Sequence, residues 1–531
     1  MSGVVLYKKV AIAQIDSKVG DFEGNAAKII DFSTLAEKKG AEIVVFPEFS
    51  LCGYPPEDLL FYTKFITDSK NIQNTLLCEL KKHVPNLHVF FGNIAEQKND
   101  NRIIQNALFE ALNGEIVRKY TKRDLPNYGV FDEQRYFTAD SSQDFRLENS
   151  ANVAVAICED IWNGIPLDVQ KSDEVIIVIN ASPFSVLKFN QRVQTTKNLA
   201  NEYNLPVVYA NLVGAQDELV FDGGSFILDE NAEVVSICPK FIEKLALEHD
   251  ITEHTDELLD IYSACVSGLR AYAFNNGFHA AVLGLSGGID SALVATMAVD
   301  AIADVVGIAM PSVYSSSSSL ADAASLANNL GIKYIEQPLG DIFNAYTSLD
   351  SNFTSNIALE NIQARIRGNF LMSYANSNSG CLVLATGNKS ELAVGYSTVY
   401  GDAIGGFAPI KDVYKTKVWE LAKRRNELSF RDLKKLGFKG SVNPIPTNSI
   451  TKPPSAELKP GQLDSDTLPD YTELDAKLEQ HIENYAQVDE HIMKMVKNAE
   501  WKRRQYPIGP KITTRSFGKD FRMPITQSTC R

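Results

Sequence analysis

The chain has 531 residues, of which 44% are hydrophobic and 22% charged, a composition typical of water-soluble globular proteins. No apolar stretch approaches the ~20 residues of a membrane-spanning helix, and the amino terminus lacks the apolar core of a secretory signal. The formal net charge of −14 argues against broad binding to nucleic acid or anionic membranes. We therefore expect a cytoplasmic protein that acts on small molecules.

Cysteine and histidine usage predicts neither a disulfide framework nor a histidine-built metal site. The cysteines are scattered from Cys52 to Cys530 without a C-x-x-C pair, which fits a reducing compartment. The histidines show no metal-ligand spacing, so we expect catalysis to depend on other side chains.

Short apolar stretches alternate with helical segments from residue 10 to 240, which predicts an α/β layered domain. One helix is expected at 27–40, because the segment ends in two lysines followed by Gly40. Strands are expected at 10–15, 42–46, 88–94, 152–157, 174–180 and 206–211.

Three reactive side chains stand out in this half of the chain. Glu48 follows the 42–46 stretch, Lys122 precedes a Pro-Asn-Tyr-Gly turn, and Cys158 stands where the 152–157 stretch ends. A thiol with a reference pKa of about 8.5 needs a base or a cation nearby to become a strong nucleophile at neutral pH. Glu48 as base and Lys122 as cation would meet that need. Singly, each has an ordinary alternative, as a buried thiol, a loop carboxylate or a solvated lysine.

Together, the motifs P-E-F-x-L-x-G-Y-P-P, K-x-x-L-P-N-Y-x-V-F-D-E and C-E-D-I-W resemble the glutamine-hydrolysing branch of the nitrilase superfamily. The resemblance implies an α-β-β-α sandwich over residues 1–248, in which Cys158 attacks the side-chain amide of glutamine. It implies that Glu48 is the base, while Lys122 and the backbone N–H of Glu159 hold the oxyanion. It also implies glutamine-binding or supporting positions for Tyr54, Tyr128, Glu133, Ser182 and Lys188.

The polar segment 243–258 is predicted to be a linker, because its composition changes abruptly, and the domain boundary is placed between residues 248 and 249. A helix with apolar residues at helical spacing is expected after it, ending at Gly277. The second domain therefore covers 249–531.

The stretch HAAVLGLSGGIDS, residues 279–291, predicts a strand that ends at two glycines and restarts as a helix. Free backbone N–H groups and the helix dipole would then surround an anion. The Walker lysine is missing and Asp290 stands in the turn, so we expect Mg²⁺ between this carboxylate and a phosphate. The motif resembles the pyrophosphate-binding loop of the ATP pyrophosphatases. A tight turn without function is the alternative.

Further along, Met310–Ala323 resembles a mobile loop near ATP, and the Pro-rich 453–469 segment is expected to act as a lid. Arg365 and Arg367 stand two residues apart, which is wrong for sharing one helix face, so we expect a bent or terminal position for them. A dense polar group after a predicted buried strand indicates a site, although solvated lysines are the default: Thr386, Lys389, Glu391, Asp402, Lys415 and Lys417.

This second block is similar to the NAD synthetase family, which implies a doubly wound, Rossmann-like parallel sheet. ATP would bind at Ser286, Gly287, Gly288, Asp290, Ser291, Thr386 and Lys415. Deamido-NAD would bind at Arg365, Glu391 and Asp402, and Asp290 and Glu391 would hold Mg²⁺.

The two halves in one chain resemble the glutamine-dependent NAD⁺ synthetases. That resemblance implies glutamine, ATP and deamido-NAD as substrates, ammonia passed through an internal channel, and a homo-oligomer of two or more chains. Another amidotransferase on the same activation loop stays open, although such enzymes usually carry a different glutaminase. A nitrilase-like binding protein with a decayed site also stays open, although Glu48, Lys122 and Cys158 are intact.

Overall fold

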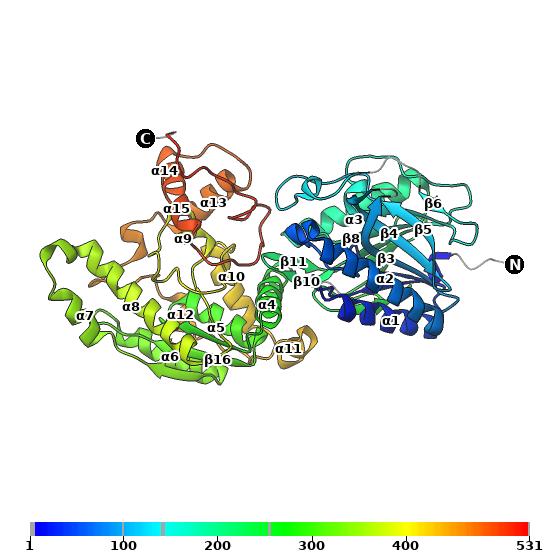
Figure 1. The fold of residues 1–531 in the computed structure, drawn as a ribbon. Helices are drawn as coiled ribbons and strands as arrows, with labels where there is room; N and C mark the ends of the chain where they lie inside the picture. Colours follow the sequence, from blue (N-terminus) through cyan, green and yellow to red (C-terminus); the bar gives the residue numbers. More distant parts are fainter. Residues whose placement is uncertain (1–5, 98–99, 140–143, 253–255, 529–531) are drawn as a thin grey trace. The chain divides into compact units, whose positions relative to one another are not determined.

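A computed structural model describes residues 6–97, 100–139, 144–252 and 256–528 (Figure 1). Cys530 lies outside these ranges. The chain forms two compact units, residues 1–255 and 256–531, which are described separately below. Among the described residues, no helix combines the length and apolarity needed to cross a membrane.

The first unit contains a seven-stranded sheet in the order β14-β1-β2-β3-β4-β5-β6. Strands β1 to β3 pair in parallel, and the remaining pairs are antiparallel. The bounds are β1 (Val10–Gln14), β2 (Ile43–Val45), β3 (His88–Gln97), β4 (Asp100–Leu112), β5 (Glu115–Thr121), β6 (Phe145–Arg146) and β14 (Lys244–Ala246).

A second sheet of five strands has the order β13-β12-β9-β8-β7, and β10 and β11 form a separate two-stranded ribbon. Strands β7, β8 and β9 are parallel and buried along their whole length, which explains their continuous Val, Ile and Ala content. The bounds are β7 (Val153–Ile157), β8 (Val175–Asn180), β9 (Val207–Asn211), β10 (Val213–Gln216), β11 (Leu219–Asp222), β12 (Phe226–Leu228) and β13 (Val234–Ile237).

The two sheets pack face to face and carry helices on their outer faces, which confirms the predicted α-β-β-α sandwich (Figure 1). Ile12 and Val45 of the first sheet share one core with Val155 and Ile177 of the second. Helices α1 (Phe22–Lys38) and α2 (Thr63–His83) cover the first sheet, and α3 (Lys188–Tyr203) covers the second. Short 3-10 turns are η1 (Leu6–Lys9), η2 (Glu57–Phe61), η3 (Glu133–Arg135) and η4 (Cys158–Ile161).

The predicted linker 243–258 is wrong at its start, because strand β14 pairs there with β1 and sets Leu245 opposite Ala13. Leu245 and Ala246 are buried. Only three apolar residues, 245–247, stand between Lys244 and Glu248. An apolar stretch of this length is too short to predict an edge strand from sequence.

The second unit is built on a four-stranded parallel sheet in the order β17-β16-β15-β18, which confirms the doubly wound prediction. The strand order reverses beside β15, and ligands of open α/β sheets bind beyond the carboxyl ends of the strands at such a point. The strands are β15 (Ala280–Gly284), β16 (Asp304–Ala309), β17 (Lys333–Glu336) and β18 (Cys381–Val383).

Helices cover both faces of this sheet. The helices nearest the sheet are α4 (Glu257–Asn275), α5 (Ile289–Ala301), α6 (Ser317–Leu330), α7 (Gly340–Thr347), α8 (Asn356–Ser377), α9 (Lys389–Val394) and α10 (Lys415–Asn426). Later segments are α11 (Phe430–Leu436), α12 (Thr447–Thr451), α13 (Tyr471–Ile482), α14 (Glu490–Asn498) and α15 (Glu500–Arg503), with 3-10 turns η5 (Ser351–Phe353) and η6 (Asp464–Asp466). A core of Leu392, Leu474, Val496 and Phe517 packs α13, α14 and the carboxyl-terminal segment around α9.

Candidate active sites

Cys158 stands at a sharp turn between strand β7 and the 3-10 turn η4. Its φ of 44° lies in the left-handed region, which non-glycine residues occupy only where the surrounding structure holds them. The residue is buried among the apolar side chains of the two-sheet core. The left-handed backbone separates Cys158 from an ordinary core thiol, which is buried but does not need this conformation.

Glu48 and Lys122 form a buried ion pair with a second carboxylate. The Nζ atom of Lys122 lies 2.9 Å from Oε1 of Glu48 and 2.8 Å from Oε1 of Glu133. Glu48 also accepts hydrogen bonds from Nδ2 of Asn106 at 2.6 Å and from the backbone N–H of Ala181 at 2.9 Å. These contacts fix the Glu48 carboxylate from three directions.

The pKa of Cys158 is influenced by both members of this ion pair. Burial raises the pKa of the thiol well above its usual value, the Glu48 carboxylate raises it further, and Lys122 opposes the rise. Cys158 is therefore a neutral thiol at pH 7, and it needs a base to take its proton as it attacks. Burial alone would lower the pKa of Lys122, but Glu133 and Glu48 raise it well above its usual value, so this residue stays a cation.

Glu133 forms an ion pair with Lys122, and its own pKa is shifted. Burial raises its pKa to about 7, against the lowering effect of Lys122, and the charge of Glu48 adds to the rise. The hydroxyl of Tyr54 donates to Glu133 over 3.0 Å. The supporting position predicted for Glu133 thus coincides with a direct contact to the lysine.

The predicted glutamine-binding side chains surround the same turn. The hydroxyl of Tyr128 donates to Oε1 of Glu159 over 2.9 Å, and Nζ of Lys188 lies 4.0 Å from the ring centre of Trp162. Ser182 is buried beside Ala181, and its N–H donates to Asn211. Their contact with glutamine stays a prediction.

Two residues of this site escaped the sequence analysis. Asn106 lies in strand β4 and donates to both Glu48 and Glu133. Its only signal is a Gln-Asn pair between the apolar residues Ile104 and Ala107 of that strand. The second is Asp160, whose carboxylate joins the segments that carry Lys122 and Cys158.

In the second unit, the Ser-Gly-Gly-Ile-Asp-Ser segment adopts the predicted strand, turn and helix. Strand β15 ends at Gly284, and α5 begins at Ile289 with Gly288 as its N-cap. Gly287 has a φ of 75°, and a Cβ atom there would lie 2.2 Å from the carbonyl oxygen of Ser319. Only glycine fits this position, which explains the residue type in the motif.

The hydroxyls of Ser286 and Ser291 lie 3.1 Å apart across this turn, and Ser286 also accepts from the N–H of Gly288 over 3.2 Å. Hydroxyls and backbone N–H groups therefore converge at the amino end of α5. Such a cluster suits a phosphate group, which accepts hydrogen bonds only.

Asp290 and Glu391 converge on Lys415, although more than a hundred residues separate the first from the other two. The Nζ atom of Lys415 lies 2.5 Å from Asp290 and 3.1 Å from Glu391. Burial raises the pKa of Glu391 to about 7 against the effect of Lys415, and Asp290 adds to the rise. Nδ2 of Asn388 donates to Asp290 over 2.8 Å and fixes that carboxylate.

This oxygen donor set fits Mg²⁺, which proteins hold with one or two carboxylates and which takes its remaining ligands from phosphate and water. No group of three or more potential His, Cys, Asp or Glu ligands exists in the described part of the chain. The pair Asp290 and Glu391 would therefore hold the ion together with ATP phosphates.

The remaining predicted residues lie around the carboxyl end of the sheet. Thr386 is half-buried in the loop from β18 to α9. Asp402 is exposed and accepts from the N–H of Thr398 over 2.7 Å, while Nε of Arg365 donates to Val399 O over 3.3 Å. Arg365 and Asp402 thus meet at one loop.

The bent or terminal position expected for Arg365 and Arg367 is wrong, because both lie inside helix α8. The two side chains reach loops on different sides of that helix. Nε of Arg367 donates to Met310 O over 3.0 Å, toward the loop expected near ATP, whereas Arg365 reaches Val399. Different directions are what a two-residue spacing on a helix provides.

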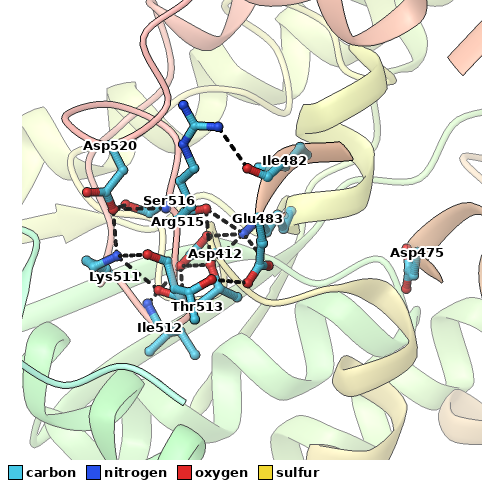
Figure 2. Close-up of polar contacts among 12 residues, drawn as sticks. Asp412, Asp475, Ile482, Glu483, Lys511, Ile512, Thr513, Arg515, Ser516 and Asp520 are labelled. Carbon is cyan, nitrogen blue, oxygen red and sulfur yellow. Dashed lines mark hydrogen bonds and ion pairs between the residues drawn. The ribbon is translucent and has the colours of Figure 1, made fainter. Parts of the chain in front are cut away.

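Lys389 is also not the solvated lysine that is expected by default, because it is fully buried. Its Nζ atom contacts Asp412 at 2.9 Å, Glu483 at 3.1 Å and Thr513 Oγ1 at 2.5 Å. Figure 2 shows the carboxyl-terminal part of this network, in which the backbone N–H groups of Ile512 and Thr513 donate to Asp412. Lys417 behaves as a surface lysine and pairs with Glu420.

Comparisons with known proteins match a family to each of the two units. The carbon-nitrogen hydrolase family matches residues 9–252, and the NAD synthase family matches residues 261–506. The chain is 38% identical to the glutamine-dependent NAD(+) synthetase of Thermotoga maritima over 98% of either chain. It is 39% identical to the enzyme of that name from Acinetobacter baylyi, over 97% of this chain and 98% of the relative.

Two solved structures share the whole fold. One is the glutamine-dependent NAD+ synthetase of Acinetobacter baumannii in complex with ADP, which is 35% identical and covers 97% of this chain and 98% of its own, with a TM-score of 0.75. The other, from Cytophaga hutchinsonii, has a TM-score of 0.78 and covers 98% of this chain and 97% of its own. At 20% identity, it supports the fold alone.

Proposed function

Because the chain belongs to the glutamine-dependent NAD⁺ synthetase family, we propose that it amidates deamido-NAD with ammonia released from glutamine. We assign glutamine hydrolysis to residues 1–248 and the ATP-dependent step to residues 249–531. The observation that carries this proposal is the presence in one chain of two separate clusters of charged and reactive side chains. One has a strained cysteine beside Glu48 and Lys122, and the other has a phosphate cradle beside Asp290.

In the first site, Cys158 attacks the amide carbon of glutamine while Glu48 takes the thiol proton. Lys122 and the backbone N–H of Glu159 stabilise the oxyanion. Glu48 then delivers the proton to the leaving nitrogen, the C–N bond breaks, and ammonia departs. Water hydrolyses the resulting thioester and frees glutamate. The raised pKa of Cys158 supports this order, because a neutral thiol needs the base during the attack.

In the second site, we assign Ser286, Gly287, Gly288 and Ser291 to the β- and γ-phosphates of ATP, with Thr386 and Lys415 beside them. Asp290 and Glu391 would hold Mg²⁺, which when bound neutralises phosphate charge. The nicotinate carboxylate of deamido-NAD attacks the α-phosphorus, and pyrophosphate leaves. Ammonia then displaces AMP and forms the amide. Lys415 lies between two carboxylates, and this arrangement of charges supports a site for a highly charged ligand such as ATP.

We assign the deamido-NAD pocket to Arg365, Asp402 and Glu391. Arg365 and Asp402 bind the same loop, 398–402, through Val399 and Thr398. This loop follows α9, the helix that carries Glu391. One short stretch therefore connects the dinucleotide residues to a metal ligand, which suits a reaction between deamido-NAD and ATP.

We further propose a cytoplasmic homo-oligomer whose minimal unit is a dimer of synthetase halves. Exposed apolar side chains gather on α7 and the start of α8, the helix that also carries Arg365: Ile342, Tyr346, Leu349, Phe353 and Ile357. Such patches mark interaction surfaces more often than bare solvent faces. Light scattering should give at least twice the chain mass of 58.6 kDa. A fully active monomer would contradict the dimer.

The experiment that tests the proposed function supplies ATP and deamido-NAD with glutamine or with ammonium and measures NAD⁺, AMP and pyrophosphate. We expect NAD⁺ from both nitrogen sources, with one AMP and one pyrophosphate for each NAD⁺. Formation of ADP and phosphate, or no NAD⁺ from either source, would contradict the assignment.

A further inference from the structure

The carboxylate of Asp160 is buried two residues after Cys158 and receives hydrogen bonds from two separate chain segments. Oδ1 accepts from the backbone N–H groups of Arg123 and Asp124, each over 2.9 Å. Oδ2 accepts from the Tyr120 hydroxyl over 2.8 Å and from the N–H of Ile157 over 3.0 Å.

These partners flank the two reactive residues. Tyr120 lies two residues before Lys122, Arg123 and Asp124 directly follow it, and Ile157 directly precedes Cys158. One carboxylate therefore bonds to the backbone around both the cation and the nucleophile. Oδ2 accepts from both segments, so a shift of the carboxylate toward one segment lengthens its bond to the other.

The same contact holds the strained turn. Cys158 has a φ of 44°, and the N–H of Ile157 before it bonds to the side chain of Asp160 after it. Left-handed backbone at a non-glycine residue persists only where its surroundings determine it. The bond from Ile157 to Asp160 spans the strained residue and closes the turn around it.

All of these partners are donors, so the position requires a group that only accepts. An ionised carboxylate accepts at both oxygens, whereas an amide of the same shape presents N–H groups on one side. An asparagine at 160 would therefore turn two donors toward the N–H groups of one segment.

We propose that Asp160 is a positioning residue for glutamine hydrolysis, which sets the distance between the Lys122 ammonium and the Cys158 thiol. The inference rests on the proposed glutaminase role of Cys158. Asp160 touches no reacting atom in this account, and it acts through the two segments that it joins.

The first test compares Asp160→Asn with the native protein in NAD⁺ formation from glutamine and from ammonium. A displacement of about 1 Å at a reacting group can cost about 100-fold in rate, so we expect a fall of about that size in kcat with glutamine. KM for glutamine should change little, because Tyr128, Ser182 and Lys188 keep their own contacts. Ammonium-supported formation should be unchanged.

A second readout follows the thiol itself. Iodoacetamide alkylates the thiolate, and mass spectrometry of the Cys158 peptide gives the alkylation rate at each pH. Lys122 opposes the rise of the thiol pKa, so a displaced lysine should move the midpoint of the pH profile upward. The charged and titratable groups that influence this site are Glu48, Tyr54, Lys122, Tyr128, Glu133, Glu159, Arg192 and Tyr209.

Two matched variants separate positioning from stability. Tyr120→Phe removes one hydroxyl and leaves the three backbone bonds to Asp160, so glutamine-supported turnover should fall far less. Asp173→Asn changes another buried carboxylate, which accepts from Gln170 and pairs with Arg146 before strand β8, at the end of the sheet away from Cys158. It should lower the melting temperature without moving the alkylation midpoint.

An unchanged kcat with glutamine in Asp160→Asn would overturn the proposal. So would a lower kcat with a native alkylation midpoint, because the loss would then be structural, as in Asp173→Asn. Cys158→Ala in the same series keeps the two hypotheses apart. If that variant retains glutamine-supported turnover, the proposed glutaminase site itself fails, whatever Asp160 does.

Discussion

The ammonium group of Lys122 lies 2.9 Å from the carboxylate of Glu48, and both side chains are withdrawn from solvent. The proposed base and the proposed oxyanion donor are thus each other's ion-pair partners. Removing one partner of a buried pair leaves an uncompensated charge. A conservative change at either residue therefore affects the charge of the whole site.

For this reason we expect Glu48→Gln to abolish glutamine use while sparing the synthetase reaction. The amide cannot take up the thiol proton, and the loss of a general base costs about 10²- to 10⁴-fold in rate. NAD⁺ formation should fall by that factor with glutamine and stay native with ammonium. Equal losses with both nitrogen sources would contradict the separation of the two reactions.

Glu133 predicts a pH-dependent stability difference. Its folded pKa of about 7, raised chiefly by burial, exceeds the ordinary value of 4.5, so folding favours the protonated acid. Stability from this group is complete below 4.5 and is lost as the pH rises through about 7. The melting temperature of Glu133→Gln relative to the native protein should therefore rise over that interval. A flat difference would show that Glu133 has an ordinary pKa.

At the second site, Asp290→Asn and Glu391→Gln should each reduce NAD⁺ formation from both nitrogen sources. Loss of one carboxylate removes a proposed Mg²⁺ ligand and several kcal/mol of charge stabilisation, which corresponds to about 100-fold or more in rate. Glutamate release from glutamine should continue. Native turnover with ammonium in either variant would contradict the placement of the ion.

The buried network of Lys389 gives a prediction about the carboxyl-terminal segment. Oγ1 of Thr513 donates to Asp412 over 2.9 Å (Figure 2) and accepts from Lys389, which begins the helix that carries Glu391. Hydrogen bonds to charged groups contribute about 1.5–3 kcal/mol to stability, so Thr513→Val should weaken the docking of this segment by about that amount and lower synthesis from both sources.

Thr526→Val is the matched control, because Thr526 is exposed in the same segment and lies outside this network. It should stay within about twofold of native turnover, as substitutions outside tight networks usually do. If both threonine variants behave alike, docking of this segment does not support the Glu391 helix.

Parts of both candidate sites could be predicted from the sequence where the local pattern of residues determines the backbone conformation. The glycines after residue 284 and the strand endings before Cys158 specify turns, because only particular backbone conformations fit there. Apolar strands alternating with helices predicted an α/β layered domain, whereas the two-sheet sandwich and the doubly wound parallel sheet were expected from the family resemblances.

Burial that depends on contacts between residues far apart in the chain could not be predicted from local sequence. Lys389 stands in a polar stretch, and only the approach of Thr513, 124 residues later, makes it a core residue. The directions of Arg365 and Arg367 likewise depend on loops around residues 310 and 399 that approach helix α8 from different sides. Spacing along one segment gives the face of a helix but not what covers it.

The central claim is that Cys158 releases the ammonia that the second unit consumes. The direct measurement is the rate of NAD⁺ formation by Cys158→Ala with saturating glutamine and with saturating ammonium. We predict that no NAD⁺ forms above background with glutamine, and that the rate with ammonium equals that of the native protein. Native turnover with glutamine, or loss of both activities in a folded variant, would contradict the claim.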